Sequence, residues 1–402
     1  MANVSSSNGL EKRPKLRFPG FDEPYKQCRI GDIYAERSQR GASDMELLSV
    51  TMNDGVMPRS EIEGKDNSSE DKSNYKVVLT GDMVYNSMRM WQGANGISPC
   101  DGIVSPAYTV LMPKIPISNG YFAALFKSPN LINEFRKNSQ GMTSDTWNLK
   151  YPQIETIKVS IPALSEQERI ADMLGTLERR ITKQAQLVDS LKKYKRGLLR
   201  DIFAKLSESG EKRCLKEVSV VFADGDWIES KDQATDGIRL VQTGNVGFGV
   251  YLDKPHNAKY ISEATFQRLN CLEIYDGDIL ISRLPEPAGR ACLLPPSEEK
   301  RITAVDCTVI RTDGAVIDRN YLLQFLCSEH YLKTVNSFLA GGTRQRISRK
   351  NLEGIEVPYP SIEQQKYYGN YLCKVDTRIS NAEHHLNCLN RLRCFMLQQL
   401  FI

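Results

Sequence analysis

The chain has 402 residues, 41% of them hydrophobic and 25% charged, and a formal net charge of +4 at pH 7. This length allows two or three domains with packed cores, and the small positive charge permits a polyanionic partner without requiring one. Ten cysteines without a C-x-x-C pair and four histidines without zinc-ligand spacing argue against a structural zinc site and indicate reduced thiols in a cytoplasmic protein.

The chain begins with residues 1–24, which we predict to be an N-terminal arm. We find neither an apolar signal-peptide region at its start nor a run of about 18 apolar residues anywhere, which predicts a protein that is neither secreted nor membrane-spanning. The stretch PKLRFPGF at 14–21 is apolar and basic, and its two prolines prevent it from being helical throughout. We expect it to lie extended on another surface of the protein.

A first block with mixed helix and strand signals follows at 25–160. Its patterns predict a short helix at 30–36, a strand at 46–51, a polar loop at 61–74, a strand–turn–strand region at 75–110 and a helix at 117–137. We therefore expect one domain of mixed α and β structure here.

The next segment, 161–208, opens with an apolar residue and a proline and then continues without proline. Its apolar residues recur at alternating spacings of three and four, which is the heptad seam of a coiled coil. The seam positions that we expect to pair with another helix are Leu174, Leu177, Ile181, Val188, Leu191 and Leu198. Such a narrow apolar stripe needs a partner helix of similar length.

The remainder of the chain repeats this plan. Block 209–356 follows the outline of the first block, for example GDILI at 277–281 against GDMVY at 81–85. Segment 357–402 carries a second seam, at Leu372, Val375, Ile379, Leu386, Leu389 and Met396. The seams match at a constant offset and share a polar break, with Lys195 in one where Arg393 stands in the other. The sequence predicts an α+β protein ordered domain, rod, domain, rod; two unrelated amphipathic helices are the alternative.

The two blocks differ most between their matched strands and in the loops before the rods. These segments are rich in groups that can read base edges, because Arg pairs with guanine and Asn or Gln with adenine in the major groove. The candidates are Asn86, Arg89, Trp91, Gln92, Thr143 and Ser144 in the first block, and Ser282, Arg283, Arg290, Thr343, Arg344, Gln345 and Arg346 in the second. Lys150, Arg349 and Lys350 are candidate phosphate contacts. For each residue the alternative is a solvated side chain, or domain core in the case of Trp91.

The catalytic motifs that we searched for are absent or incomplete in this sequence. No P-loop, GxSxG or HExxH occurs, SPAY at 105–108 lacks the second proline of an amino-methyltransferase motif, and GNVGFG at 244–249 precedes no helix pattern. Asp54, Glu63 and Lys65 have the residue types of a metal-dependent nuclease but lie in a polar loop. We predict a non-catalytic chain that binds no metal, and cryptic nuclease chemistry at these three residues is the alternative.

Several of these segments together resemble specificity subunits of type I restriction-modification enzymes. They are IPALSEQERIADML at 161–174, PSIEQQKYY at 360–368, GLLRDIF at 197–203, MLQQLF at 396–401, GDILISR at 277–283 and the arm PKLRFPGF. The resemblance covers nearly the whole chain. It implies two target-recognition domains, each reading one half of a bipartite, asymmetric DNA site, joined and separated by two long antiparallel coiled-coil helices.

The resemblance also implies partners and a location. We expect double-stranded DNA, two methyltransferase subunits docked on the helices, and motor-endonuclease subunits in the cytoplasm of a prokaryote. S-adenosylmethionine, ATP and Mg are expected on those subunits and not on this chain. The second helix departs from the first by the segment KYYGNY, whose Gly369 costs up to about 1 kcal/mol of helix stability relative to Ala. A coiled-coil interaction scaffold without DNA readout is the alternative function.

Overall fold

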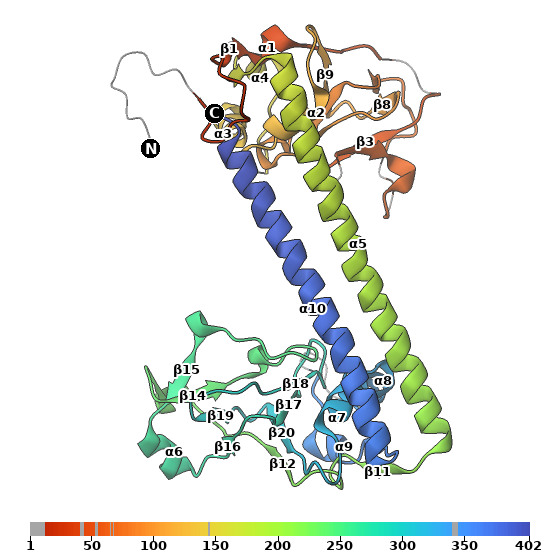
Figure 1. Ribbon diagram of the computed structural model, residues 1–402, viewed down its shortest axis with the longest axis vertical. Helices are drawn as coiled ribbons and strands as arrows, with labels where there is room; N and C mark the ends of the chain where they lie inside the picture. Colours follow the sequence, from red (N-terminus) through yellow and green to blue (C-terminus); the bar gives the residue numbers. More distant parts are fainter. Residues whose placement is uncertain are drawn as a thin grey trace. The chain divides into compact units, whose positions relative to one another are not determined.

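The computed structural model describes residues 13–40, 44–52, 55–64, 66, 68–143, 145–339 and 345–402. The chain divides into two compact units, unit 1 with Met1–Ala185 and His385–Ile402, and unit 2 with Gln186–His384. Two long helices, α5 (Leu164–Ser209) and α10 (Ile362–Gln399), each contribute residues to both units (Figure 1). Within the described residues, none of the helices combines the length and apolar composition needed to cross a bilayer.

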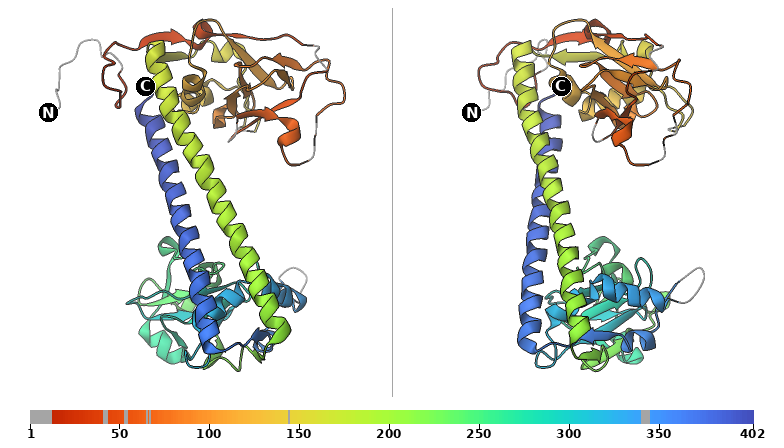
Figure 2. Two further views of the ribbon diagram at one scale, coloured as in Figure 1. Left: turned by 45° about the vertical axis from the view of Figure 1, so that its right-hand side comes forward. Right: turned by 90° about the vertical axis from the view of Figure 1, so that its right-hand side faces the viewer.

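Unit 1 is built on a four-stranded antiparallel sheet in the order β2-β9-β6-β7, seen from two further sides in Figure 2. The strands are β2 (Tyr34–Glu36), β9 (Tyr108–Pro113), β6 (Met83–Asn86) and β7 (Asn95–Ile97). Three strand pairs accompany it: β1 (Lys26–Arg29) with β10 (Lys158–Ile161), β3 (Leu48–Thr51) with β4 (Gly55–Pro58), and β5 (Lys76–Val78) with β8 (Gly102–Val104). The helices are α1 (Ile30–Ile33), α2 (Asn119–Leu125), α3 (Pro129–Asn138) and α4 (Tyr151–Ile154).

The core of unit 1 includes the ends of both long helices. Ile170 and Leu174 of α5 and Leu400 beyond α10 are buried in the same cluster as the aromatic side chains of the domain. The ring of Phe401 packs edge-on against Tyr121, with centroids 5.4 Å apart. Because burial of a large apolar side chain contributes about 1.5–3 kcal/mol, the helix ends are an integral part of this fold.

Unit 2 contains a four-stranded and a five-stranded sheet. The first has the order β12 (Val221–Asp224), β20 (Cys307–Arg311), β17 (Ile279–Ser282) and β18 (Ala291–Leu293). The second has the order β13 (Gln233–Ala234), β15 (Lys259–Ile261), β14 (Ile238–Val241), β19 (Arg301–Thr303) and β16 (Glu273–Ile274). A further pair joins β11 (Lys212–Cys214) to β21 (Glu356–Pro358), and the short helices are α6 (Glu263–Leu269), α7 (Arg319–Leu326), α8 (Glu329–Ser337) and α9 (Arg349–Glu353).

The predicted repeat is present in local detail, and a buried glutamine shows how closely. In unit 1, Gln167 accepts a hydrogen bond from the backbone N–H of Ser118 at 3.1 Å, and its amide donates to the carbonyl of Pro162 at 3.0 Å. In unit 2, Gln365 accepts from the N–H of Asp318 at 3.0 Å and likewise donates to a proline carbonyl. Each glutamine thereby fastens the start of a domain helix to the start of a long helix.

The sequence patterns were wrong at three places. The single helix expected at 117–137 is two helices, α2 and α3, because Ser128 caps the second and Pro129 stands in its first turn. The short helix expected at 30–36 ends at Ile33 and continues as β2. Both long helices begin later than 161 and 357, because Ile161 is the last residue of strand β10, directly before Pro162, and Val357 and Pro358 lie in strand β21.

Candidate nucleic-acid interface

In unit 1, the two segments singled out by the sequence analysis lie against each other beyond strand β6. The N–H of Leu149 donates a 2.8 Å hydrogen bond to the carbonyl oxygen of Ser87, which joins the loop before α5 to the turn after β6. The rings of Trp91 and Trp147 also meet, with centroids 5.2 Å apart. Tip 1 denotes these joined segments, residues 86–92, 140–143 and 145–150.

Tip 1 holds several of its predicted readers, and its predicted phosphate contact, in solvent. The exposed ones are Arg89, Gln92, Thr143 and Lys150. Asn86 is partly buried because its Oδ1 accepts a 3.0 Å hydrogen bond from the N–H of Met88. Trp91 is also partly buried; its Nε1 donates to the carbonyl of Met88, and the Arg136 guanidinium lies over its ring. These contacts of Asn86 and Trp91 fix the turn after β6. The remaining predicted reader, Ser144, lies outside the described residues.

Unit 2 repeats this junction with different side chains. The N–H of Ile347 donates to the carbonyl of Arg283 at 3.2 Å, in the positions that Leu149 and Ser87 occupy in unit 1. Tip 2 denotes the described residues 283–290 and 345–350. The exposed predicted readers and phosphate contacts there are Gln345, Arg346, Arg349 and Lys350. Thr343 and Arg344 lie outside the described residues.

Two exposed arginines of tip 2 also have acidic neighbours. Arg346 lies 3.4 Å from a carboxylate oxygen of Asp306, and Arg349 lies 3.3 Å from Glu353 one helical turn later. Both ion pairs are solvent-accessible and so contribute at most about 1 kcal/mol each. A phosphate or a base edge can therefore compete for either guanidinium.

Three other predicted readers of unit 2 point into the protein. Ser282 and Arg283 are 0% and 3% exposed. The Arg283 guanidinium donates to the carbonyl of Val305 and pairs with Asp224 at 3.2 Å, and burial lowers its pKa. Both side chains are buried because Ser282 ends β17, a strand that is buried on both faces, and Arg283 follows it directly. This placement argues against the base contacts predicted for Ser282 and Arg283.

The contacts of Arg290 indicate that this residue has a structural role. Its three nitrogens donate to four backbone carbonyls at 2.7–3.0 Å, and burial lowers its pKa. The acceptors are Val246, Leu284, Pro287 and Thr243. Arg290 therefore ties the loop after β17 to the 243–246 turn, and removing it would leave several carbonyls without this donor.

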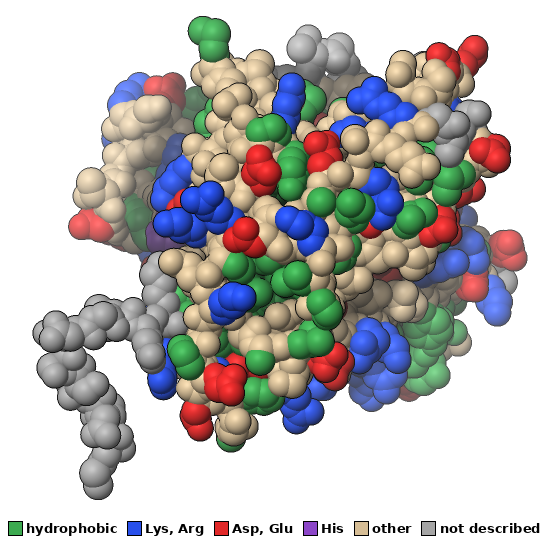
Figure 3. Space-filling view, turned by 90° about the horizontal axis from the view of Figure 1, so that it is seen from above, with side chains coloured by type: hydrophobic (Ala, Val, Ile, Leu, Met, Phe, Trp, Pro, Cys, Tyr) green, Lys and Arg blue, Asp and Glu red, His purple; other side chains and the backbone are tan. Residues whose placement is uncertain are grey.

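Catalytic groups do not gather in the described part of the chain. No group of three or more His, Cys, Asp and Glu side chains there is arranged to hold a metal ion. Of the nuclease-like residues, Glu63 is exposed, and Asp54 and Lys65 lie outside the described residues. On the face shown in Figure 3, basic and acidic side chains are intermixed and no continuous basic surface crosses it.

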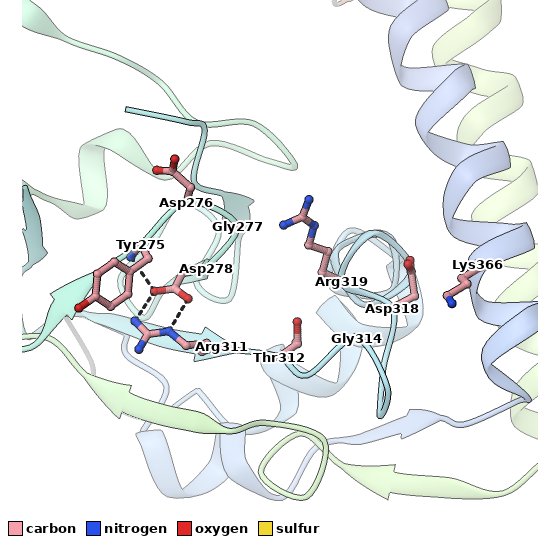
Figure 4. Close-up of a pocket in the computed structure, with 10 residues that line it drawn as sticks. All are labelled: Tyr275, Asp276, Gly277, Asp278, Arg311, Thr312, Gly314, Asp318, Arg319 and Lys366. Carbon is pink, nitrogen blue, oxygen red and sulfur yellow. Dashed lines mark hydrogen bonds and ion pairs between the residues drawn. The ribbon is translucent and has the colours of Figure 1, made fainter. Parts of the chain in front are cut away.

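A polar cavity of about 500 Å³ in unit 2 is lined by two loops, the start of α7 and Lys366 of α10 (Figure 4). Inside it, the Arg311 guanidinium donates to both oxygens of Asp278, at 2.8 and 2.7 Å, which raises the pKa of Arg311. The Asp278 carboxylate also accepts from the N–H of Tyr275. These groups satisfy one another and brace the loop, so the cavity offers no activated nucleophile.

Within each unit, the long helices pack along their predicted seams. Leu174, Ile181, Val188, Leu372, Val375, Ile379 and Leu389 are buried, and Leu177, Leu191, Leu198, Leu386 and Met396 are partly buried. Next to Leu198, Leu199 is only 4% exposed and takes the deeper position, because α5 packs there on the domain as well as on α10.

The shared polar break in the seams forms equivalent ion pairs. Lys195 of α5 donates to Asp376 of α10 in unit 2, and Arg393 of α10 lies 3.5 Å from Glu178 of α5 in unit 1. Lys195 and Arg393 are related by the repeat offset, as are Glu178 and Asp376. In each unit the paired segments run antiparallel, and the ion pairs favour one register over neighbouring ones.

Comparison with known proteins agrees with these features. Residues 23–193 and 208–391 both match the family described as Type I restriction modification DNA specificity domain. The specificity subunit of the type I restriction enzyme MjaVIII from Methanocaldococcus jannaschii is 25% identical over 331 residues, which cover 76% of each chain. Together these matches point to a specificity subunit.

Solved structures with the same fold were also found. The S subunit of a type I restriction-modification system from M. genitalium has a TM-score of 0.61 at 15% identity and covers 97% of this chain and 99% of that one. A chain from a study of complex assembly and conformational transition of the type I R-M system has a TM-score of 0.59 at 17% identity and covers 96% and 98%. These likenesses establish the fold, two domains of mixed α and β structure with two long helices.

Proposed function

This chain belongs to the family of type I restriction-modification DNA specificity domains, and from that premise we propose that its two units each read one half of a bipartite, asymmetric DNA site. One observation carries the proposal. The same backbone hydrogen bond joins the two segments of each tip, from Leu149 to Ser87 and from Ile347 to Arg283, yet the exposed side chains that it presents are different. One frame with two chemistries is suited to two unlike half-sites.

The chain serves as a specificity subunit and leaves catalysis to its partners. We assign 25–160 and 209–356 to the two recognition domains, 1–24 to the arm, and 161–208 and 357–402 to the helices that set the spacer. The helices dock two methyltransferase subunits, and motor-endonuclease subunits complete the complex. S-adenosylmethionine, ATP and Mg bind to those subunits and not to this chain. The complex works in the prokaryotic cytoplasm, where its DNA is.

The exposed residues of the tips are the proposed contacts. Arg89, Gln92 and Thr143 in tip 1 and Gln345 and Arg346 in tip 2 reach base edges, since exposed Arg, Gln and Thr side chains can hydrogen-bond them. Lys150, Arg349 and Lys350 hold the phosphate backbone, which fixes the register of the protein on the duplex. Ser144, Thr343 and Arg344 stay predicted readers by sequence alone. Ser282, Arg283 and Arg290 are omitted because they hold the fold.

Exchange of one recognition domain tests the proposal. Residues 25–160 are replaced by the corresponding block of a relative, and methylated sites are mapped in a host that supplies the methyltransferase subunits. We expect one half of the motif to change and the other half, with the spacer, to stay. The reciprocal exchange of 209–356 should change the opposite half. Changes on both sides after either exchange, or an unchanged motif after both, would contradict the proposal.

A further inference from the structure

Tip 1 exposes two methionine side chains, whereas the exposed apolar side chains in the described part of tip 2 are those of Pro285 and Pro287. Met142 is fully exposed, and Met88 is 41% exposed. Trp147 stands two residues before Leu149 of the shared junction, where tip 2 has Gln345 two residues before Ile347. At this position tip 1 therefore carries an indole ring where tip 2 carries an amide group.

The backbone of tip 1 holds Met142 away from the domain. Gln140 and Asn148 exchange two backbone hydrogen bonds, at 2.9 and 2.8 Å, and the N–H of Thr146 donates to the carbonyl of Thr143 at 3.0 Å. Gly141 has φ +147, and a Cβ there would meet the carbonyl oxygen of Thr146 at 2.6 Å. These hydrogen bonds and the required glycine fix the described backbone on either side of Met142, and its side chain is presented outward.

The two methionines belong to one surface through the tryptophan pair. Met88 lies in the turn that Trp91 closes by donating its Nε1 proton to the Met88 carbonyl at 3.1 Å. Met142 lies in the loop that carries Trp147, and the ring contact between Trp91 and Trp147 joins that loop to the turn. Packing of the two rings fixes the positions from which both methionines project.

The charges around this surface favour a polyanion over an apolar protein groove. Arg89 and Lys150 are exposed in the same two segments, and the Arg136 guanidinium lies 5.6 Å from the Trp91 ring centroid. Asp145 is the acidic residue of the loop. Cationic groups beside exposed apolar ones match a DNA groove, in which phosphates flank base edges.

We propose that Met142 and Met88, supported by the Trp91–Trp147 pair, contact thymine methyl groups in the half-site read by unit 1. This inference rests on the proposed function. The thymine C5-methyl is the apolar group that the major groove offers to a protein, and contact with it distinguishes thymine from the other bases. A flexible thioether side chain adapts to such a small apolar target. Tip 2, with Gln345 and Arg346, reads its half-site by hydrogen bonds instead.

Deoxyuridine substitution tests the inference, because it removes the methyl group and leaves the hydrogen-bonding edge unchanged. Affinity of the complete methyltransferase complex is measured for target duplexes in which each thymine of one half-site is replaced in turn. Domain exchange identifies which half-site belongs to unit 1. We expect about fourfold weaker binding for each contacted methyl in that half and unchanged binding for replacements in the other half.

A protein variant assigns the effect to tip 1. With Met142→Ala, the difference between thymine and deoxyuridine should shrink at one base pair of the unit 1 half-site, as a coupled pair requires. Met52→Ala is the matched control, since Met52 is an exposed methionine of the same unit outside the tip, and it should keep the full difference. Both variants replace exposed side chains and leave the buried core intact.

Unchanged affinity for all deoxyuridine duplexes of that half-site would overturn the inference, as would a full thymine preference in both Met142→Ala and Met88→Ala. Either result leaves the proposed function standing if the complex still discriminates its site from unrelated DNA. A complex that shows no such discrimination overturns the proposed function and this inference together.

Discussion

The N-terminal arm makes a prediction about stability that the geometry of one ion pair quantifies. Arg17 of the arm donates from Nε and Nη2 to the two carboxylate oxygens of Glu166, at 2.9 and 2.8 Å, and Glu166 is 1% exposed. The hydroxyl of Tyr25 donates to the same carboxylate at 3.3 Å. In Arg17→Ala this carboxylate stays buried with Tyr25 as its remaining donor among these contacts. Removing one partner of a buried pair costs about 3–5 kcal/mol, and because Arg17 itself is 15% exposed we expect about 3 kcal/mol.

Urea denaturation followed by tryptophan fluorescence can measure this loss in unit 1. Trp91 and Trp147 lie in unit 1 and Trp227 in unit 2, so a Trp227→Phe background makes the signal specific. We expect the free energy of unfolding to fall by about 3 kcal/mol. Adding Glu166→Gln should recover part of the loss, since a neutral amide is less costly to bury than an unpaired carboxylate.

Arg213→Ala provides the matched control for the arm prediction, and its stability is measured without the Trp227→Phe change because Trp227 reports on unit 2. Arg213 in unit 2 pairs with Glu211 at 2.9 Å, but both side chains are largely exposed, and the guanidinium also lies over the ring of Tyr359. Loss of such a surface pair costs at most about 1 kcal/mol. If Arg17→Ala costs no more than Arg213→Ala, the arm does not act as a buried clamp and the reasoning is refuted.

Three further predictions concern the helices and one partly buried acid. Inserting seven residues after Ser190 and after Asn387 keeps both seams in phase and adds about 10 Å to each helix. At about 3.4 Å per base pair, methylome sequencing should find the spacer longer by about three base pairs. An unchanged spacer would show that the helices do not measure the site. Lys195→Glu should destabilise unit 2 by about 1 kcal/mol, and Asp376→Lys should restore most of that stability; equal loss in single and double variants would exclude an ion-pair role. Burial raises the pKa of Asp226 above its ordinary value of 3.8, so the folded state binds this proton more tightly and its contribution to stability is lost as the pH rises through the raised pKa. Asp226→Asn should therefore gain stability relative to the natural protein between pH 4 and neutrality, and parallel stability profiles in urea titrations would contradict that shift.

The helices were predictable because their pattern is long and periodic. Heptad spacing specifies which face is buried whatever the partner is, so the seam positions could be named from the sequence. The repeat offset also identified Lys195 and Arg393 as equivalent polar positions. It did not identify their partners Asp376 and Glu178, because many charged residues flank each seam and only packing of the two helices decides which of them meet.

The tips were predictable as regions and not as individual side chains. Arg283 and Arg290 are polar residues beside a strand, but β17 is buried on both faces, so alternation along the strand carries no information about which side chains reach solvent. Their guanidiniums are occupied by backbone carbonyls. Met142, the thymine contact that we propose, was not among the sequence candidates, because a search for hydrogen-bonding groups passes over an apolar residue in a polar loop.

The separation of frame and tip explains how one scaffold can carry two specificities. The frame consists of buried interactions that recur in both units, such as Gln167 and Gln365 at the helix starts, and losing a buried hydrogen-bonding partner costs about 1–3 kcal/mol. Exposed tip residues such as Arg89 and Gln345 contribute little to folding, since surface substitutions usually change stability by about 0.5 kcal/mol or less. Under the proposed function, changes at the tips are therefore restricted mainly by DNA binding, while changes in the frame are restricted by folding. Because each tip is attached through the same kind of backbone junction, Leu149 to Ser87 in unit 1 and Ile347 to Arg283 in unit 2, the proposed readers of one unit can be replaced without disturbing the other.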